Sequence, residues 1–440
     1  MESPPEHTTP SLPPAGPQPD PPAGPQPDLP AGPQTDPPAG PQPGPPAGPP
    51  PGSPPDPPPE PASGSPARRP PSRRPPARNR PLLILVLVAA LLLIALAAAA
   101  LATRHHGGGT PFTGRLNAPQ GGRHQRVTAW LTSTSRSLDT ALAARALDEI
   151  DCDWYTIGAQ GTVSAGPENL ALVATARAHG VQAFATVTNR PSSRGSFTSS
   201  IVRSILSSPG TQKRAIDSLV ALAVTKGYDG IDIDWELIPA TQRDAFSGFM
   251  AALATALHAH DRLLSVAVFA KTSEPGRWDS QKATDYRALG GSVDELKIMT
   301  YSYNGPWSSP GPQAPLAWTN AVIDFARTIV PAGKIYMGLP FYGYDWHAGG
   351  ANDVQATDAA TLIATHHFKV AHDPASGEAD LSYIDANGVK HVLYFVDRQA
   401  LATKLSLLES SFPGIGGVAI WQVYREDPAF WTTITQTMSH

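Results

Sequence analysis

Cysteine is nearly absent from this sequence, and neither sign of charge dominates it. The 440 residues include one cysteine, Cys152, and 33 lysines and arginines against 37 aspartates and glutamates. A single cysteine excludes an internal disulfide, and because Cys152 stands among apolar residues we predict that it packs in the core. The net charge of −4 provides no basic excess for binding phosphates, so we expect no nucleic-acid partner.

Large apolar side chains are scarce in the first 80 residues, which consist mainly of proline, glycine and alanine. The unit PPAGPQPD occurs at 13–20 and again at 21–28, and then decays. Such a segment cannot bury enough apolar surface to offset its chain entropy, so residues 1–80 are predicted to be a disordered cytoplasmic tail. Glycine does not recur at every third residue, which excludes collagen. A proline-binding module is a candidate partner for this tail.

Charge is missing from residues 82–102, an apolar run that directly follows the arginine-rich segment ARRPPSRRPPARNR. As a helix this run is long enough to cross a hydrocarbon core of roughly 30 Å, so residues 81–103 are predicted to be one transmembrane helix. A buried core helix is the alternative, but globular helices are apolar along one stripe only. Arginines stay on the cytoplasmic side, which predicts a single-pass type II protein of the cell membrane with an extracellular C-terminal part. Residues 104–125, rich in glycine, are interpreted as a linker.

Short β-rich runs alternate with amphipathic segments from residue 126 to residue 440. Strands are predicted at 127–132, 153–159, 181–189, 229–237, 263–270, 295–303, 334–344 and 417–424. Helices are predicted between them at 137–150, 168–180, 211–227, 243–261 and 316–330. This α/β order favours a (β/α)8 TIM barrel, with a doubly wound open sheet as the alternative.

The connection between the last two predicted strands is too long for a single helix. It contains two alternating apolar runs on either side of Asn387 and Gly388, a pair of residues typical of a two-residue hairpin turn. We therefore predict a small α+β insertion at about 346–395.

Four carboxylates crowd the predicted strand GYDGIDIDWEL at 227–237. Side chains alternate along a strand, so Asp232, Asp234 and Glu236 point to one face, whereas Asp229 is out of phase and is expected to bond backbone at the strand entrance. In a barrel the acidic face lines the interior, with Glu236 nearest the C-terminal rim, where active sites lie. Acids spaced about 6 to 7 Å apart repel one another, so at least one should hold a proton near neutral pH.

Two plainer interpretations of the acidic strand remain, a solvated strand face and a divalent metal site. A solvated face would hardly alternate with isoleucines and a tryptophan, and no histidine stands beside the motif. We therefore expect no metal and no cofactor.

The acidic stretch matches DxxDxDxE, the signature of glycoside hydrolase family 18, the chitinase-like (β/α)8 hydrolases. KIMTYSYN, MGLPFYGYDW and GIGGVAIWQVYREDPAFW resemble later strands of the family, so the resemblance spans 126–440. TVTN at 186–189, together with YFVDRQALATKL and EDPAFW, is similar to the bacterial branch that contains spore-cortex and cell-wall N-acetylglucosaminidases.

The resemblance implies a role for each residue of the acidic strand. In this family the substrate's own 2-acetamido oxygen attacks, in place of an enzyme carboxylate. Glu236 would then be the general acid and base, Asp234 would orient the acetamido group, and Asp232 would tune their protonation. Tyr301 would donate a hydrogen bond to the acetamido carbonyl.

The resemblance also implies contacts with the sugar. Met299 would line the pocket and Trp421 would form its floor, with core packing as the alternative for Trp421. Tyr344 and Trp346 are weaker candidates for sugar stacking, as is Trp307, and each of the three is equally compatible with supporting a loop.

One position departs from the family pattern. The family's aspartate after the tyrosine is Ser302 in this sequence, which affects the pH optimum or the rate without removing the acid.

The resemblance implies an enzyme that acts on a polysaccharide containing N-acetylglucosamine. We expect a membrane-anchored β-N-acetylglucosaminidase of peptidoglycan, with chitin as the second choice. The rival hypothesis is a catalytically silent barrel that binds carbohydrate. Silent relatives often lack the acidic glutamate, and the intact Glu236 counts against this rival.

Overall fold

The computed structural model describes residues 114–132, 137–193 and 195–438. The predicted tail at 1–80, the predicted transmembrane helix at 81–103 and the first part of the predicted linker lie outside the described residues. Among the residues that are described, no helix is both long and apolar enough to span a membrane.

Eight parallel strands form a closed barrel, because β1 pairs with β2 on one side and with β14 on the other. The barrel strands are β1 (Arg126–Leu131), β2 (Glu149–Ile157), β4 (Gln182–Thr188), β5 (Gly230–Asp234), β6 (Leu263–Phe269), β7 (Glu295–Met299), β8 (Ile335–Pro340) and β14 (Gly417–Trp421). Each lies within or overlaps a predicted strand, which confirms the (β/α)8 barrel and excludes the open sheet. One extra short strand, β3 (Val163–Ala165), pairs antiparallel with β2.

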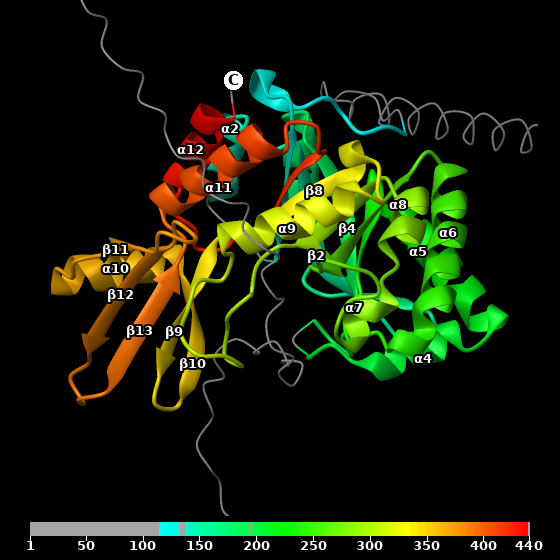
Figure 1. Cartoon of the computed structure of the whole chain (residues 1–440). Coiled ribbons are helices and arrows are strands. Elements are labelled where there is room, and N and C mark those ends of the chain that lie inside the picture. The colour runs from blue at the N-terminus through cyan, green and yellow to red at the C-terminus, as the bar shows by residue number, and fades with distance from the viewer. Residues whose placement is uncertain (1–113, 133–136, 194, 439–440) are drawn as a thin grey trace, which may run out of the picture. The chain divides into compact units, whose positions relative to one another are not determined.

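Helices follow the barrel strands along the chain. They are α2 (Ser137–Ala143), α3 (Leu170–Ala178), α4 (Ser199–Leu206), α5 (Pro209–Lys226), α6 (Arg243–His258), α7 (Asp279–Ala283), α8 (Tyr286–Ser292), α9 (Leu316–Arg327), α11 (Arg398–Ser411) and α12 (Ala429–Thr437). Three 3-10 turns, η1 (Gln120–Gly122), η2 (Ala240–Gln242) and η3 (Ala332–Lys334), complete the connections. Helices α4, α5 and α6 pack beside one another on the outside of the barrel (Figure 1).

Helix α5 shows how local sequence sets these boundaries. The hydroxyl of Ser208 accepts a hydrogen bond from the backbone N–H of Thr211 at 3.2 Å and so caps the first turn. Pro209 occupies the first turn, where its missing N–H costs nothing. The helix ends where Gly227 adopts a left-handed conformation with a φ of 75°, which glycine enters without steric penalty.

The main apolar core lies between the strands and the outer helices. Ile231 and Ile233 of β5 are fully buried in it. Trp235 follows them on the same side and stacks on Phe249 of α6, with ring centroids 5.1 Å apart. The apolar residues of the acidic strand therefore face the helices, as the alternation predicts.

The strand β14 closes the barrel at a point of close approach. A Cβ atom on Gly417 would lie 1.9 Å from the carbonyl oxygen of Arg126, which is far inside contact distance. Only glycine lets the first and last strands come together here.

The second strand differs from the prediction. It begins at Glu149 rather than at Asp153, and the helix predicted at 137–150 ends at Ala143. The segment DEIDCD reads as polar and helical, but its acids at alternate positions face a charged barrel interior. An acidic residue ordinarily indicates an exposed position, but Asp151 is completely buried beside Lys297.

A second sheet lies between β8 and β14, where the α+β insertion is expected. Its five antiparallel strands, in the order β10-β9-β13-β12-β11, are β9 (Tyr342–His347), β10 (Gly350–Gln355), β11 (Ala371–His372), β12 (Ala379–Ile384) and β13 (Lys390–Phe395), with helix α10 (Ala356–His366). Figure 1 shows β9, β10, β12 and β13 as a separate layer in yellow to orange. Strands β12 and β13 form the hairpin predicted around Asn387 and Gly388.

The start of this sheet also differs from the prediction. The run at 334–344 is not one strand but two, because β8 ends at Pro340 and β9 begins at Tyr342. Between them, the backbone N–H of Phe341 donates to the carbonyl of Trp421 at 2.7 Å. The inserted sheet therefore begins at Tyr342 and not near residue 346.

A buried ion pair fastens the inserted sheet to the barrel. Lys404 of α11 lies 3.0 Å from Glu378, and both side chains are almost completely buried. Glu378 also accepts hydrogen bonds from the backbone N–H groups of Gln313 and Ala314, each at 2.8 Å. This carboxylate has several donors, which offsets the cost of burying its charge.

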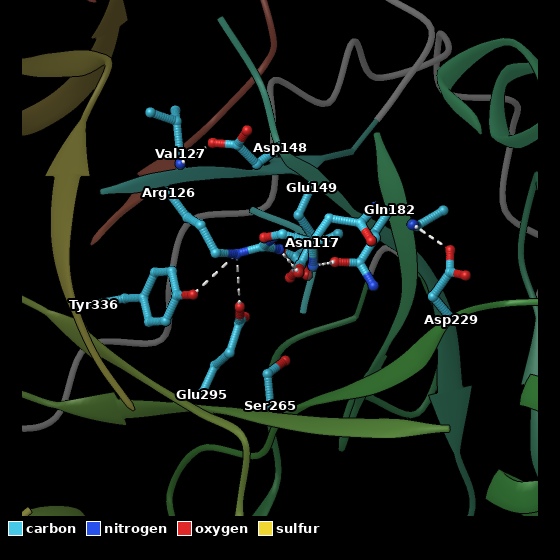
Figure 2. A network of polar contacts seen from close by, with 12 residues as sticks. Asn117, Arg126, Val127, Asp148, Glu149, Gln182, Asp229, Ser265, Glu295 and Tyr336 are labelled. Atoms are coloured by element: carbon cyan, nitrogen blue, oxygen red, sulfur yellow. Dashed lines mark hydrogen bonds and ion pairs between the residues drawn. The ribbon is translucent and has the colours of Figure 1, made fainter. Parts of the chain in front are cut away.

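The N-terminal end of the barrel is filled by charged and polar side chains (Figure 2). The guanidinium of Arg126 lies 2.7 Å from Glu149 and 3.5 Å from Glu295, and its Nε donates to the hydroxyl of Tyr336 at 3.1 Å. It also donates to the backbone carbonyl of Asn117 at 2.7 Å. We call Arg126, Glu149, Asp151, Glu295 and Lys297 the barrel-floor charges.

Candidate active site

The acidic strand delivers its three inward carboxylates to the interior of the barrel. Asp232 is fully buried and accepts three hydrogen bonds, from Trp130 Nε1 at 2.9 Å, Thr186 Oγ1 at 3.0 Å and Ser265 Oγ at 2.6 Å. Asp232 is thus held in place by side chains from three other strands, β1, β4 and β6.

Lys297 connects Asp232 to the barrel-floor charges. Its ammonium lies 2.6 Å from Asp151, 2.9 Å from Glu149, 3.4 Å from Glu295 and 3.7 Å from Asp232, and its side chain is fully buried. The surrounding anions raise the pKa of Lys297 well above its ordinary value despite its burial. The positively charged Lys297 therefore lies inside the barrel beside Asp232, the first inward acid of the acidic strand.

Asp234 and Glu236 are 5% and 6% exposed and occupy the C-terminal end of the barrel. Burial raises the pKa of Glu236 to about 7, which leaves it largely protonated below neutral pH. Burial and the adjacent Glu236 raise the pKa of Asp234 well above its ordinary range. Oδ1 of Asp234 is buried without a hydrogen-bond partner. The pair thus offers an acidic proton and a carboxylate oxygen that lacks a donor.

The side chain of Asn189 fixes the backbone of Glu236. Its Oδ1 accepts from the backbone N–H of Glu236 at 2.9 Å, and its Nδ2 donates to the carbonyl of Glu236 at 2.8 Å. The same Nδ2 lies 3.0 Å from the carbonyl of Thr198. Glu236 stands two residues beyond the end of β5, where the hydrogen bonds between strands have stopped. The side-chain amide of Asn189 holds the backbone of Glu236 in their place.

An ion pair stands next to the acidic pair and was not predicted from the sequence. Arg190, directly after Asn189, lies 2.7 Å from Asp153 of β2. The guanidinium lowers the pKa values of Asp234 and Glu236, although burial has the larger and opposite effect. Residue alternation along β4 places 186, 188 and 190 on one side, a signal that was present in the sequence.

Tyr301 follows β7 and lies near the same carboxyls. Burial, together with the negative charges of Asp234 and Glu236, raises the pKa of its hydroxyl well above the ordinary value. Tyr301 therefore remains a hydrogen-bond donor throughout the physiological pH range. Met299, the last residue of β7, is half-buried two positions before it.

Ser302 occupies the position where the family pattern has aspartate. Its hydroxyl lies 2.8 Å from the hydroxyl of Tyr342, the first residue of the inserted sheet. Its backbone φ is 58°, in the left-handed region. A neutral pair of hydroxyls thus stands where the family pattern places a charge.

Trp421 ends β14 and joins two aromatic groups. It packs against Trp130, with ring centroids 5.9 Å apart and ring planes inclined at 59°. It also contacts the cluster formed by Tyr342, Tyr344 and Trp346. Trp421 is half-buried, so part of its surface remains open at the C-terminal end of the barrel.

The other aromatic candidates lie deeper. Tyr344 is 2% exposed and Trp346 is 6% exposed, so both present little surface for stacking on a sugar. Trp346 Nε1 donates to the carbonyl oxygens of Gly305 and Ser308, which fixes the loop between them. Trp307, half-buried on that loop, packs edge-on against Tyr344 at 6.3 Å.

Two further residues singled out in the sequence lie away from these carboxyls. Asp229 accepts from the backbone N–H of Ala183 at 2.9 Å and pairs with Arg177 at 2.6 Å, which suits a structural role at the strand entrance. Cys152 is completely buried, and burial raises the pKa of its thiol well above the ordinary value. A protonated, enclosed thiol is a packing group and not a nucleophile.

Within the described ranges, no group of three or more histidine, cysteine, aspartate or glutamate side chains has an arrangement suited to a metal ion. The acids of the barrel floor are instead paired with Arg126 and Lys297. All candidate catalytic groups described above are side chains of the chain itself.

The chain is similar in sequence to known glycosidases. Residues 180–426 match the family described as Glycosyl hydrolases family 18. An uncharacterized glycosylase, YvbX, of Bacillus subtilis (strain 168) is 29% identical over 58% of this chain and 74% of its own length. The cortical fragment-lytic enzyme of the same organism is 28% identical over 54% of this chain and 56% of its own length. The chain thus spans little more than half of the latter enzyme.

The fold is also similar to solved structures. The crystal structure of a chitinase from Chromobacterium violaceum superimposes with a TM-score of 0.66 and 29% identity, over 72% of this chain and 99% of that one. The spore cortex-lytic enzyme SleL of Bacillus cereus superimposes with a TM-score of 0.65 over 71% of this chain and 74% of that one. At 24% identity, the second likeness concerns the fold alone.

Proposed function

The chain belongs to family 18 of the glycosyl hydrolases and is a glycosidase, and from this premise we propose that it cleaves β-linked N-acetylglucosamine units of peptidoglycan. Chitin is the second candidate polymer. We further propose that the enzyme is anchored in the cell membrane by residues 81–103, with the barrel outside the cell.

The arrangement of Asp234 and Glu236 carries this proposal. Oδ1 of Asp234 is buried and has no donor, although a buried oxygen of this kind ordinarily has one. The N–H of a 2-acetamido group would supply that donor. Glu236 beside it has a pKa of about 7, which suits a group that gives a proton and later takes one back.

The proposed reaction uses the substrate's acetamido oxygen as nucleophile. Glu236 gives its proton to the glycosidic oxygen as the bond to the anomeric carbon breaks, and the acetamido oxygen bonds to that carbon. The resulting oxazolinium ion carries a positive charge that Asp234 stabilises. Water then attacks the anomeric carbon as the bond from that carbon to the acetamido oxygen breaks, and it gives one proton to Glu236, which restores the starting state of the enzyme. Tyr301 donates to the acetamido oxygen during both steps.

The three acids have different proposed roles, which agree with their different surroundings. Asp232 accepts hydrogen bonds from three donors and has a lysine 3.7 Å away, so it is fixed in place within the barrel. Burial, Glu236 and, to a smaller extent, Asp232 raise the pKa of Asp234. One strand and the residues directly after it therefore supply an anchored acid, an orienting group and a proton donor in sequence.

Peptidoglycan is favoured over chitin by two observations. The segments TVTN and EDPAFW resemble the cell-wall branch of the family. A relative with 28% identity is named as a cortical fragment-lytic enzyme, and its name refers to spore cortex material. The membrane location is supported by the apolar run 82–102 and by the arginines that precede it.

The test is release of reducing ends from purified peptidoglycan and from chitin oligomers by the full-length chain in detergent. Glu236→Gln is the inactive comparison, and Glu409→Gln on α11 is a matched control outside the site. We expect the wild type and Glu409→Gln to cleave peptidoglycan and Glu236→Gln to be inactive. Cleavage of the chitin oligomers alone would show that the substrate is chitin and not peptidoglycan. If the wild type binds either polymer without cleaving it, the proposed activity would be refuted in favour of a catalytically silent carbohydrate-binding barrel.

A further inference from the structure

We infer that the ion pair of Arg190 and Asp153 is a working part of the active site, in which Arg190 acts on Asp234 and Glu236 and Asp153 limits that action. Both are positioning residues, since they act through the acidic pair and not on the substrate. The inference rests on the proposed function, because it concerns how that site controls its protons.

Strand register brings the ion pair to the acidic pair. Thr186 of β4 lies opposite Asp232 of β5, and Thr188 lies opposite Asp234. Thr186 donates its hydroxyl to Asp232 and therefore faces the barrel interior. Arg190 continues this inward series by two more residues, as Glu236 continues the series on β5.

The second member of the pair comes from the other neighbouring strand. Asp153 of β2 lies opposite Thr186, just before a register shift after which the pairing resumes with Tyr155 opposite Val187. Asp153 is thus the last inward residue before the bulge, and bulges often re-aim side chains beside active sites. Three adjacent strands, β2, β4 and β5, bring an anion, a cation and two acids to one place.

Arg190 is held firmly in this position. Its Nη2 lies 2.7 Å from Oδ2 of Asp153, and the two side chains are 18% and 6% exposed. The guanidinium stacks over the ring of Phe197 at 4.8 Å from the ring centre. Its Nε is buried without a partner, which is costly for a group whose task is only structural.

The other charged groups around the acidic pair are already engaged. Lys297 is surrounded by the barrel-floor anions and by Asp232. Tyr301 is neutral, because burial raises its pKa. In the part of the chain that the structure describes, Arg190 is the cation that lowers the pKa values of both Asp234 and Glu236.

The two members of the ion pair have opposite effects on the site. Arg190 favours the ionised acids, whereas Asp153 favours the protonated ones. Without Arg190, the pKa of Asp234, which burial already raises, would rise further and weaken its ability to stabilise a positive charge. Without Asp153, the unopposed guanidinium would lower the pKa of Glu236 and make its acidic proton easier to lose. The ion pair therefore keeps one proton on the acidic pair near neutral pH.

The experiment compares pH profiles of kcat/KM for reducing-end release by the full-length chain. Arg190→Gln should move the alkaline limb up by about one pH unit, and Asp153→Asn should move it down by a similar amount. The double variant should return the limb to near the wild-type position, and Arg190→Lys should also remain near it. Arg203→Gln, an exposed arginine on α4, is the matched control.

A purely structural ion pair would give a different result. Both single variants would then lose kcat while their limbs stayed in place, and this outcome would overturn the inference. Carboxyl carbon NMR of Glu236, assigned by its loss in Glu236→Gln, measures the same pKa shifts without turnover. If the wild type is inactive but the pKa of Glu236 shifts in opposite directions in Arg190→Gln and Asp153→Asn, the proposed function is refuted and the inference stands. If the pKa of Glu236 is unchanged in both folded variants, the inference alone is refuted.

Discussion

The ammonium of Lys297 lies 2.6 Å from a carboxylate oxygen of Asp151, and neither side chain is exposed at all. A TIM barrel interior is ordinarily filled by branched apolar side chains. Here a lysine on β7 and an acid on β2 cross the barrel to meet, and the charges of Glu149 and Glu295 join them. The stability of the barrel therefore depends on charge balance as well as on packing.

Lys297→Met should destabilise the protein by roughly 3 to 5 kcal/mol, because it leaves buried anions without their cation. The change is measured by chemical unfolding followed by tryptophan fluorescence, since all nine tryptophans lie between Trp130 and Trp431. Lys213→Met is the matched control, because the ion pair of Lys213 with Asp217 is exposed and worth about 1 kcal/mol at most. Equal effects of the two substitutions would contradict the role assigned to Lys297.

Asn189→Ala should lower kcat by roughly 100-fold while KM changes little. The amide holds the backbone of Glu236 on both its N–H and its carbonyl, and a displacement of about 1 Å is enough for a loss of this size. Steady-state kinetics on the cleaved polymer give both constants. Asn352→Ala, on the exposed strand β10, should leave them unchanged. A rise in KM alone would show that Asn189 serves binding and not placement of the acid.

Tyr301→Phe should reduce kcat by about 100-fold to 1,000-fold, the cost of removing one well-placed donor to a developing charge. The aromatic ring remains, so packing and unfolding temperature should hardly change. Tyr424→Phe, which alters a tyrosine that is 38% exposed, is the comparison. Full activity of Tyr301→Phe would mean that its hydroxyl does not contact the reacting group.

Glu236→Gln should stabilise the protein increasingly as pH rises from about 4.5 to 7. Burial raises the folded-state pKa of Glu236 to about 7, so ionising it in the folded chain lowers stability across this window. The expected gain relative to wild type reaches about 3 kcal/mol above pH 7 and vanishes below pH 4.5. Unfolding curves of both chains at matched pH values measure the difference. A difference that is constant with pH would contradict the shifted pKa.

The barrel could be predicted from the sequence because most strands alternate with amphipathic helices. The acidic strand was equally clear, since Asp232, Asp234 and Glu236 stand at alternate positions among large apolar residues. These features are local, and side-chain alternation alone decides which face is buried. The apolar partners of the strand, such as Trp235 on Phe249, follow from the same rule.

The second strand and the ion pair could not be predicted in the same way. Glu149 and Asp151 look like residues of an exposed helix until their partners Arg126 and Lys297 are known to lie across the barrel. The role of Arg190 depends on the register of β4 against β5, which ends with Thr188 opposite Asp234, two residues before Arg190 and Glu236. Alternation with Thr186 and Thr188 suggests the side on which Arg190 lies, but its pairing with Asp153 of another strand leaves no local signal and is seen only in the fold.

The short junction at Phe341 has a consequence for how the protein unfolds and how it meets a long sugar chain. Its backbone is tied to Trp421, and its ring packs against Phe430 and Trp431 of α12 at 4.8 and 5.5 Å. No slack segment separates the barrel wall from the strand that carries Tyr342 and Tyr344. Barrel and inserted sheet should therefore melt in a single cooperative transition. The aromatic cluster of Tyr342, Tyr344 and Trp346 is then already ordered when the chain folds. Little further conformational entropy should therefore be lost from these side chains when a polymer binds.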